Sequence, residues 1–486
     1  MSSNRVEDVC CDHAPAEGAA VFVEDAHAGP GVARARAAAA RGAGDGPRGQ
    51  SDQSETGAVE ARASSDAVQA RARRLLLCLD GVPLEVIRRA KSRGLFDNFG
   101  EPAGLLSPFP TMTNIALSAM MGATPPLGYE SLYFDRGAKE LRGGVRKYIG
   151  RRTPDKVPSS YMDELDYQEP LPFEFLVYVA PDAVWRADMR RFRERFRAAP
   201  PGRDFFAFLK GTDGLLHIRG PEKLQVALES LDKILKEIQA TCGDETEIVL
   251  FSDHGMNLEE NRRVHLQTQL RSNGFRVADR FGVAKRGDRN SVAAPAFGLC
   301  GYAAVYCSDE TDPAHVAAAL TPLEGVDFSV YREGASSVVV RGARGAARIT
   351  RAENGRGALY SYEQLGGDPL ELAAVKKSLD EAGELDAAGF ASDAAWFART
   401  AGHTYPDAPA NLFNSLHRER VRHTADVLVS LSDGYYYGMS FFSRFVRLLA
   451  THGNALRSST HAFMMSTHRR FPAHVRADDA QPHLRG

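Results

Sequence analysis

The sequence predicts an α/β protein, a three-layer α/β/α sandwich with a mainly parallel central sheet and an inserted, smaller α+β cap. Three short runs, at 75–79, 205–209 and 247–251, are apolar throughout except for Glu247 and are typical of strands that are buried on both faces. A long helical pattern separates the second run from the third, and this strand–helix–strand order favours parallel strands joined by right-handed crossovers. The length of 486 residues leaves room for one large domain with a sizeable insertion.

The first predicted strand ends in Asp80-Gly81. A helix is expected near 83–93, followed by a loop rich in proline and glycine. This loop leads to the segment 109–113, which reads Phe-Pro-Thr-Met-Thr. The next segment, 114–121, has a helical composition and is followed by a glycine, which is a common helix stop. The first part of the core therefore has an aspartate at the end of a strand and a threonine at the start of a helix.

Charged side chains also follow the second and third predicted strands. Asp213 and His217 come after the second strand, and Asp253-His254 comes directly after the third. Between them a helix is expected to begin at Pro221, because apolar residues then recur at steps of three and four. These residues are Leu224, Leu228, Leu231, Leu235 and Ile238.

The remaining segments complete a predicted division of the chain into five parts. The N-terminal segment has almost no aromatic residues and cannot bury enough apolar area to fold, so we expect it to be disordered. Runs at 301–307, 337–341 and 358–362 lie in a less regular stretch that we interpret as the cap, and core periodicity returns at 427–431. The expected parts are a disordered tail (1–73), the first part of the catalytic core (74–265), the inserted cap (266–419), the last part of the core (420–472) and a polar tail (473–486).

The charge balance points away from large anionic partners. Lys and Arg total 60 and Asp and Glu total 62, for a net charge of −2, which gives no reason to expect nucleic acid or an anionic membrane as a partner. The six cysteines show no paired spacing of the kind that holds a structural zinc ion. The N-terminus lacks the pattern of a secretory signal, and no apolar run approaches the ~20 residues of a membrane-spanning helix. We therefore expect a cytoplasmic protein that acts on a small molecule, and the sequence leaves its oligomeric state open.

Aspartate and histidine side chains are expected to gather at one edge of the sheet. In an open α/β sheet, ligands bind beyond the carboxyl ends of the strands, and all three predicted strands end in such residues. Carboxylate oxygen and imidazole nitrogen are the ligands that zinc takes when no thiolate is offered. Each motif considered alone also has an ordinary structural explanation: Asp80-Gly81 is a turn, and His217 is a half-buried histidine. The joint pattern favours one shared pair of metal ions.

The order of the short motifs resembles the alkaline-phosphatase-like superfamily, and within it the type I phosphodiesterase/nucleotide pyrophosphatase proteins. The motifs are Leu-Asp-Gly, Pro-Thr-x-Thr, Thr-Asp-x-x-x-His, Ser-Asp-His-Gly-Met and Thr-His-Gly. The resemblance covers roughly 74–265 and 420–468. It implies a metal-dependent phosphoric ester hydrolase that acts on a phosphate monoester or diester with the help of two divalent metal ions. Zinc is the ion that the resemblance implies, and manganese also suits a site rich in oxygen ligands.

The resemblance also implies which residues hold the metal ions. One ion is expected to be held by Asp80, Asp253 and His254. The other is expected to be held by Asp213, His217 and a third histidine. His452, in Thr-His-Gly, is our choice for this third ligand, and His403 in Gly-His-Thr-Tyr is the rival.

The nucleophile is expected to be Thr113, the second threonine of Pro-Thr-Met-Thr. A threonine hydroxyl is a poor nucleophile at neutral pH, and coordination to a metal ion lowers its pKa. The start of a helix offers backbone N–H groups and a positive dipole end to a phosphate. Thr111 is the alternative nucleophile, with a capping or turn hydroxyl as its structural role. Asn114 is expected to donate a hydrogen bond to a phosphate oxygen, although an exposed residue in the first helical turn explains it equally well.

The substrate is less well specified than the metal site. The diesterase branch usually reads Thr-Phe-Pro-Asn at the nucleophile, whereas this chain reads Thr-Asn-Ile-Ala from Thr113. That branch has an asparagine about twenty residues later, whereas this chain has Leu-Tyr-Phe-Asp-Arg at 132–136, in which Arg136 is either a phosphate ligand or a surface residue. A diester substrate is therefore only modestly favoured over a monoester. The aromatic residues at 435–437 and 441–442 either pack in the core or stack on an aromatic leaving group.

Three alternative functions remain. The first is a metal-binding domain of the same fold without catalytic activity, and the second is a phosphonate-ester hydrolase or phosphotransferase of the same superfamily. The third alternative is an unrelated serine hydrolase, which is disfavoured because no Gly-x-Ser-x-Gly sequence is present. The sulfatase branch of the superfamily is excluded, because the chain has no Cys/Ser-x-Pro-x-Arg motif.

Overall fold

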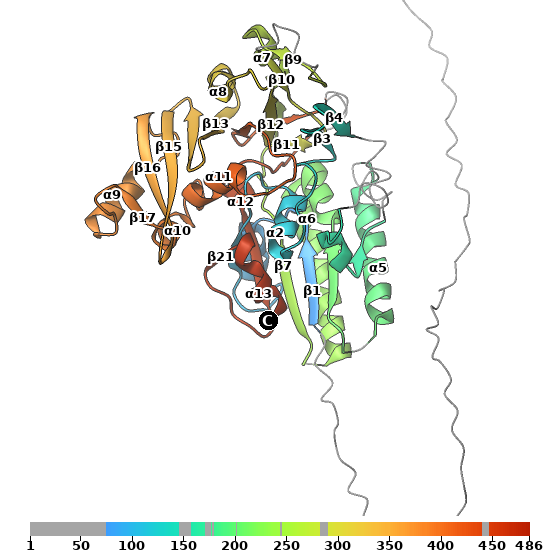
Figure 1. Cartoon of the computed structure of the whole chain (residues 1–486). Coiled ribbons are helices and arrows are strands. Elements are labelled where there is room, and N and C mark those ends of the chain that lie inside the picture. Colours follow the sequence, from blue (N-terminus) through green and yellow to red (C-terminus); the bar gives the residue numbers. More distant parts are fainter. Residues whose placement is uncertain are drawn as a thin grey trace, which may run out of the picture. The chain divides into compact units, whose positions relative to one another are not determined.

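The computed structural model describes residues 74–144, 157–170, 176, 179–200, 202–243, 245–281, 290–439 and 447–486 (Figure 1). The tail expected over 1–73 lies outside these residues. The same holds for 441–442 of the aromatic cluster.

A seven-stranded, mainly parallel sheet forms the core, as the sequence predicts. β1 pairs in parallel with β6 on one side and β7 on the other, so that Leu76 lies opposite Phe206 and Val249. The three apolar runs are therefore the three central strands of the parallel part of the sheet. In sheet order the strands are β21 (His474–Arg476), β2 (Ala103–Leu106), β20 (His461–Ser466), β7 (Glu247–Ser252), β1 (Arg74–Leu79), β6 (Phe205–Leu209) and β5 (Tyr167–Gln168).

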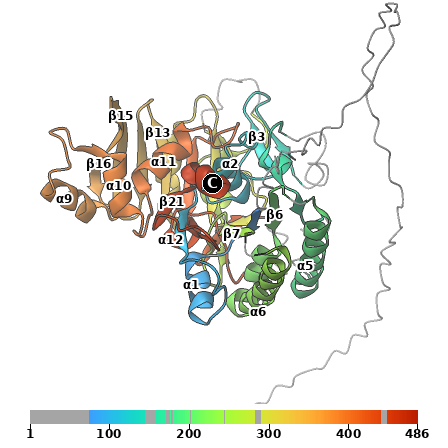
Figure 2. The same cartoon turned by 90° about the horizontal axis from the view of Figure 1, so that it is seen from below.

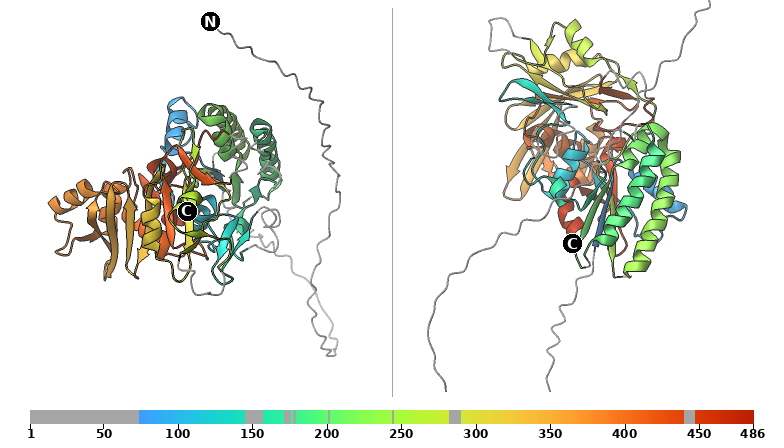
Figure 3. Two further views of the ribbon diagram at one scale, coloured as in Figure 1. Left: turned by 90° about the horizontal axis from the view of Figure 1, so that it is seen from above. Right: turned by 90° about the vertical axis from the view of Figure 1, so that its right-hand side faces the viewer.

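Helices cover both faces of this sheet, which gives the expected three layers (Figures 1 and 2). Alternate residues of β1 enter two separate cores: Leu77 packs with residues of α1, α5 and α6, and Cys78 packs with residues of α2 and α13. Figure 3 shows the two long green helices, α5 and α6, side by side on one face. The helices are α1 (Leu84–Ser92), α2 (Thr113–Met121), α5 (Pro181–Ala198), α6 (Gly211–Cys242) and α13 (Ala480–Arg485).

The helix expected from Pro221 is the second part of α6. The backbone leaves helical geometry at Gly220, where φ is 72°, and this region of φ favours glycine. The first part of α6 therefore forms a separate short helix that begins immediately after β6. Its position brings Asp213 and His217 to the carboxyl end of the sheet.

A second, nine-stranded sheet follows, and it is mainly antiparallel. In sheet order its strands are β17 (Phe390–Ser392), β16 (Gly357–Gly367), β15 (Gly345–Asn354), β14 (Ser337–Gly342), β13 (Val326–Glu333), β18 (Val427–Leu431), β12 (Tyr302–Cys307), β10 (Ser291–Ala293) and β9 (Arg276–Val277). Its helices are α7 (Leu266–Ser272), α8 (Pro313–Leu320), α9 (Ala373–Glu381), α10 (Asp393–Thr400) and α11 (Ala408–His417).

The short elements are β3 (Leu132–Asp135), β4 (Glu140–Gly143), η1 (Tyr161–Glu164), β8 (Arg262–Arg263), β11 (Leu299–Cys300), β19 (Tyr435–Gly438), α12 (Arg457–Thr460) and η3 (Ala477–Asp479).

Two segments differ from the sequence-based expectation. β18, which we expected to resume the catalytic core, instead lies inside the second sheet between β13 and β12. Residues 473–486, expected as a polar tail, add the edge strand β21 and the helix α13 to the core. Few apolar residues suffice there: Val475, Ala477, Ala480 and Leu484 are buried in the core, and polar contacts add to them.

Arg476 joins the C-terminal segment to the second sheet region through ionic contacts. Its guanidinium donates to both carboxylate oxygens of Asp393 at 2.6 and 2.8 Å, and to both of Asp407 at 2.6 and 2.8 Å. Asp407 is buried, and burial raises its pKa to about 6, although Arg476 acts to lower it. The arginine therefore compensates a carboxylate that water cannot reach.

We expect Arg476→Ala to lower the free energy of unfolding by roughly 3 kcal/mol, because a buried carboxylate would lose its cation. Urea unfolding followed by circular dichroism measures this change. Arg418→Ala is the matched control, because Arg418 also pairs with an aspartate, Asp478, but its side chain is 54% exposed. The control is expected to change stability by no more than about 0.5 kcal/mol. Equal effects of the two substitutions would contradict the prediction.

Candidate metal centre and nucleophile

The predicted site residues follow three adjacent strands of the core sheet. Asp80 follows β1, Asp253 and His254 follow β7, and Asp213 lies in the first turn of α6 after β6. Because β6, β1 and β7 are parallel neighbours, their carboxyl ends meet at one edge. The arrangement brings all six expected metal ligands together, in two groups of three.

Gly81 allows the strand end to pack this closely. Its φ is +70°, and a Cβ atom placed there would lie 2.9 Å from Met256 Cε and 3.3 Å from Asp213 Oδ1. The Gly81 N–H also donates to Asp253 Oδ1 at 3.1 Å. The Asp-Gly pair is thus part of the site as well as a turn.

The first group consists of Asp80, Asp253 and His254, which are all buried. His254 Nε2 lies 3.4 Å from Asp80 Oδ1 and 3.4 Å from Asp253 Oδ2. One nitrogen and two carboxylates therefore converge on one point.

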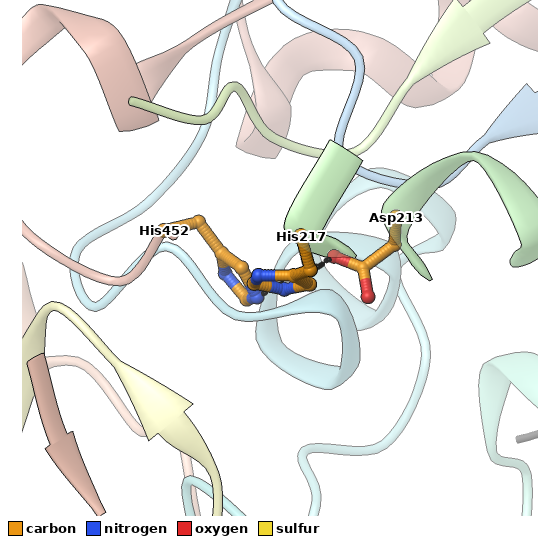
Figure 4. A group of neighbouring side chains, drawn as sticks. All are labelled: Asp213, His217 and His452. Atoms are coloured by element: carbon orange, nitrogen blue, oxygen red, sulfur yellow. Dashed lines mark ion pairs between the residues drawn. The ribbon is translucent and has the colours of Figure 1, made fainter. Parts of the chain in front are cut away.

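The second group consists of Asp213, His217 and His452 (Figure 4). Asp213 Oδ1 lies 3.0 Å from His217 Nε2 and 3.8 Å from His452 Nε2. The two groups are neighbours, because the His452 ring stacks on the His254 ring with centroids 3.9 Å apart. His403 belongs to neither group, and its Nδ1 instead accepts from the Tyr405 N–H. The geometry thus favours His452 over its rival.

All three histidines are held in the same tautomer. The Nδ1 of His217 lies 2.6 Å from the Ala450 carbonyl oxygen, that of His254 lies 2.9 Å from the Gly255 oxygen, and that of His452 lies 2.8 Å from the Thr111 oxygen. Since a carbonyl only accepts, each Nδ1 must carry the proton. Nε2 is then the nitrogen that remains to bind an ion inside the site, which is the usual arrangement of a metal-binding histidine.

Buried carboxylate oxygens in both groups have no hydrogen-bond donor. Within the described residues, Asp80 Oδ2, Asp213 Oδ1 and Asp253 Oδ2 lack one. An unpaired buried carboxylate is costly unless a cation compensates it. Three anionic carboxylates and three imidazole lone pairs, with no thiolate, fit two divalent ions such as Zn²⁺ or Mn²⁺.

The pKa values reflect the same excess of negative charge. Burial raises the pKa of Asp80 to about 8, and the charges of Asp253 and Asp213 add to this effect. Burial alone would lower the pKa of His254, but the neighbouring Asp253 and Asp80 raise it to about 9. Bound cations would reverse this balance and favour ionised carboxylates and neutral imidazoles.

Thr113 is the first residue of α2 and lies against the first group. Its Oγ1 is 3.3 Å from Asp80 Oδ1 and 3.3 Å from His254 Nε2. Asn114 lines the same pocket, and its Oδ1 accepts from the Tyr161 hydroxyl at 2.8 Å. The Asn114 amide nitrogen has no hydrogen bond to another described residue, so it is available to donate to a ligand.

Thr111 has a different role, because its hydroxyl is buried and engaged on both sides. Its Oγ1 accepts from the Gly453 N–H at 2.8 Å and donates to the Asn454 carbonyl at 3.2 Å. Its own carbonyl accepts from His452 Nδ1. Thr111 therefore positions the loop that presents His452.

We expect Thr111→Val to weaken binding of one metal ion at least ~10-fold, because the His452 loop loses two hydrogen bonds. Zinc titration calorimetry measures the two sites. Thr111→Ser keeps the hydroxyl and is expected to bind both ions nearly as the natural chain does. Unchanged zinc affinity in Thr111→Val would show that the loop does not depend on this hydroxyl.

The site lies in a pocket of about 180 Å³. Several polar residues that sequence analysis missed also line it: Glu130, Ser131, Gln168, Glu169 and Lys210. Arg136 does not line the pocket, and instead forms an ion pair with Asp426 at 2.9 Å. The described aromatic residues at 435–437 do not line it either, and Tyr437 packs in the second sheet region, where its hydroxyl donates to the Ala294 carbonyl.

The sequence pattern of the family described as type I phosphodiesterase/nucleotide pyrophosphatase matches residues 137–354. This span contains Asp213, His217, Asp253 and His254, whereas Asp80 and Thr113 lie before it. No curated protein sequence matches the chain. In the described part of the chain, no helix has both the length and the apolar character needed to cross a bilayer.

Solved structures with similar coordinates include two hydrolases. Phosphonoacetate hydrolase from Sinorhizobium meliloti 1021 is 13% identical, with 85% of this chain and 95% of that chain covered and a TM-score of 0.46. Human ectonucleotide pyrophosphatase/phosphodiesterase 5 is 13% identical, with 84% and 93% covered and a TM-score of 0.43. The family match over 137–354 agrees with the order of the motifs, and both make the chain similar to the type I phosphodiesterase/nucleotide pyrophosphatase proteins, which are phosphoester hydrolases.

Proposed function

We propose that this chain hydrolyses phosphoric esters with Thr113 as nucleophile and with two divalent metal ions. The observation that carries the proposal is the position of Thr113 Oγ1, 3.3 Å from both Asp80 Oδ1 and His254 Nε2 at the start of a helix. Asp80, Asp253 and His254 would hold one ion, and Asp213, His217 and His452 would hold the other. The identity of the ions as zinc and a cytoplasmic location stay predictions.

The residues of the chain divide the work of a two-step displacement. Thr113 Oγ forms a bond to phosphorus while the bond to the alcohol oxygen breaks, and water then hydrolyses the phosphorylated threonine. The backbone N–H groups at the start of α2 and the amide of Asn114 donate to the phosphoryl oxygens. When bound, the metal ions supply Lewis-acid stabilisation and lower the pKa of the attacking hydroxyl group.

An assay of the purified, metal-loaded protein tests this proposal. p-Nitrophenyl ethyl phosphate and p-nitrophenyl phosphate serve as matched diester and monoester, with chelator-treated enzyme as the control. Turnover that chelator abolishes and zinc or manganese restores would support the proposal, and the ratio of the two rates would distinguish diesterase from monoesterase. Two tightly bound ions without turnover of either ester would favour the non-catalytic metal-binding domain instead.

A further inference from the structure

The outer side of α5 is rich in arginine. Six of its 18 residues are arginines, although the whole chain has a net charge of only −2. Four of the six recur at steps of four, three and four residues, which places them on one line along the helix. These are Arg186, Arg190, Arg193 and Arg197. At 1.5 Å of rise per residue, the line is about 16 Å long.

This line of arginines forms one side of a groove between α5 and α6, which lie side by side (Figure 2). The groove has a volume of about 430 Å³, and all four arginines line it. Its floor is apolar, because it is lined by the buried side chains of Trp185, Met189 and Ile234. None of these residues lines the pocket that contains Thr113. The groove is therefore a surface distinct from the proposed active site.

Most of the positive charge on this side of the groove is not compensated within the described part of the chain. Arg193 forms an ion pair with Glu237 of α6 at 2.8 Å. The side chains that form neither an ion pair nor a hydrogen bond with the described residues are Arg186, Arg190 and Arg197. Glu194 also lines the groove, and it too has no ion pair there. Like charges on one line of a helix repel each other, and an anionic partner would relieve this repulsion.

An exposed valine extends the other side of the groove. Val226, Ser230 and Ile234 follow one another at steps of four along α6, and the last two line the groove. Val226 is 59% exposed, and few large apolar side chains of the described residues face water in this way. Trp185 Nε1 donates to Ser230 Oγ at 3.1 Å and so fixes the two helices beside each other. The groove thus presents an apolar line from α6 beside a cationic line from α5.

The width and the floor of the groove favour a polypeptide over a nucleic acid. The exposed side of α6 is mixed in charge and includes Glu222, Glu229 and Glu237, so the cationic surface is only one helix wide. A nucleic-acid duplex is wider and would meet these carboxylates with its phosphates. Trp185 is 5% exposed, so its ring is not available to stack on a base of a single strand. An α-helix fits such a groove, and its carboxylates would pair with guanidinium groups at the same helical spacing.

We propose that the groove between α5 and α6 binds an acidic, amphipathic α-helix of a partner protein. The acidic side of that helix contacts the arginines of α5, and its apolar side covers Val226 and the floor of the groove. The proposal goes beyond the proposed function and does not depend on it.

Fluorescence anisotropy tests the proposal with a labelled, alanine-rich helical peptide of about 20 residues. Its glutamates repeat the spacing of the four arginines, and leucines form the adjacent line. The full-length protein is titrated into this peptide and into a matched peptide that has glutamine at each glutamate position. Arg190→Glu is the test variant and Arg195→Glu is the matched control. Both arginines are exposed on α5, but Arg195 does not line the groove. Val226→Ser tests the apolar line.

We expect the glutamate peptide to bind at least ~10-fold more tightly than the glutamine peptide at low ionic strength, and added salt to reduce this difference. Arg190→Glu should weaken binding of the glutamate peptide about tenfold, because it replaces an attraction by a repulsion. Val226→Ser should weaken it about threefold through the loss of apolar contact. Arg195→Glu should leave the affinity unchanged. The melting temperatures of the three variants show whether each one is folded.

Equal affinities for the two peptides, or equal losses in Arg190→Glu and Arg195→Glu, would overturn the proposal. A single-stranded oligonucleotide and phosphatidylserine vesicles are titrated at the same salt concentration. If either bound more tightly than the glutamate peptide, and if Arg190→Glu abolished that binding, the surface would belong to a nucleic acid or a membrane and the proposal of an acidic helix would be wrong.

Discussion

Replacing Thr113 by alanine is expected to lower turnover of an aryl phosphodiester at least ~100-fold. The substitution removes the only hydroxyl that lies 3.3 Å from both Asp80 and His254 among the described residues. Metal binding should be unaffected, because Thr113 belongs to neither ligand group. Steady-state kinetics gives the loss of turnover, and metal analysis of the same sample gives the ion content.

Two further variants separate a nucleophilic role from a structural one. Thr113→Ser retains a hydroxyl at the start of α2 and should keep most of the activity that alanine loses. Thr111→Ala should act through metal binding, so that excess zinc restores its turnover in part, which it cannot do for Thr113→Ala. Full activity in Thr113→Ala together with none in Thr111→Ala would assign the nucleophile to Thr111.

The central strands were predictable because burial on both faces leaves a run of almost entirely apolar residues. β1, β6 and β7 each have this pattern, and each pairs in parallel as expected. β18 has the same pattern, but an apolar run does not say which of two sheets a strand joins. Its partners β12 and β13 lie about a hundred residues earlier in the sequence, so only the three-dimensional structure determines the pairing.

The C-terminal segment was missed for a different reason. Half of residues 473–486 are polar or charged and few are large and apolar, which is typical of an exposed tail. The segment is nevertheless ordered by a few specific contacts: β21 pairs with β2, Leu484 is buried, and Arg476 binds two aspartates. Ionic contacts between residues far apart in the sequence leave no periodic signal.

Within the site, local motifs identified the candidate residues, but they did not decide between two candidates of the same residue type. Spacing alone left Thr111 beside Thr113 and His403 beside His452, and the distances in the folded chain favour one residue of each pair. Glu130 had no signal at all, because a single glutamate in a loop is ordinary. Its place in the pocket depends on Gly298 and Cys300, which lie 168 and 170 residues away in the sequence.

The second large effect is expected at Asp213. Its Oδ1 lies between His217 Nε2 at 3.0 Å and His452 Nε2 at 3.8 Å, and it lacks a hydrogen-bond donor among the described residues. Asp213→Asn keeps the shape of the side chain and removes the negative charge that the ion requires. We expect the variant to bind about one ion fewer per chain. Turnover should fall on the order of 1,000-fold, since a bound metal ion contributes several kcal/mol to the transition state.

Asp188→Asn is the matched control for this variant. Asp188 is also fully buried, its Oδ2 also lacks a donor among the described residues, and its Oδ1 accepts from the Tyr167 hydroxyl, which an asparagine oxygen can replace. It belongs to neither metal group, so its variant should keep both ions and most of the turnover. Because an ion that binds only the folded chain stabilises it, added zinc should raise the melting temperatures of the natural chain and of Asp188→Asn equally, and that of Asp213→Asn by less. If Asp213→Asn retained its full ion content, Asp213 would not be a metal ligand. Its Oδ1, which has no hydrogen-bond donor among the described residues, would then be compensated by a proton and not by a metal ion.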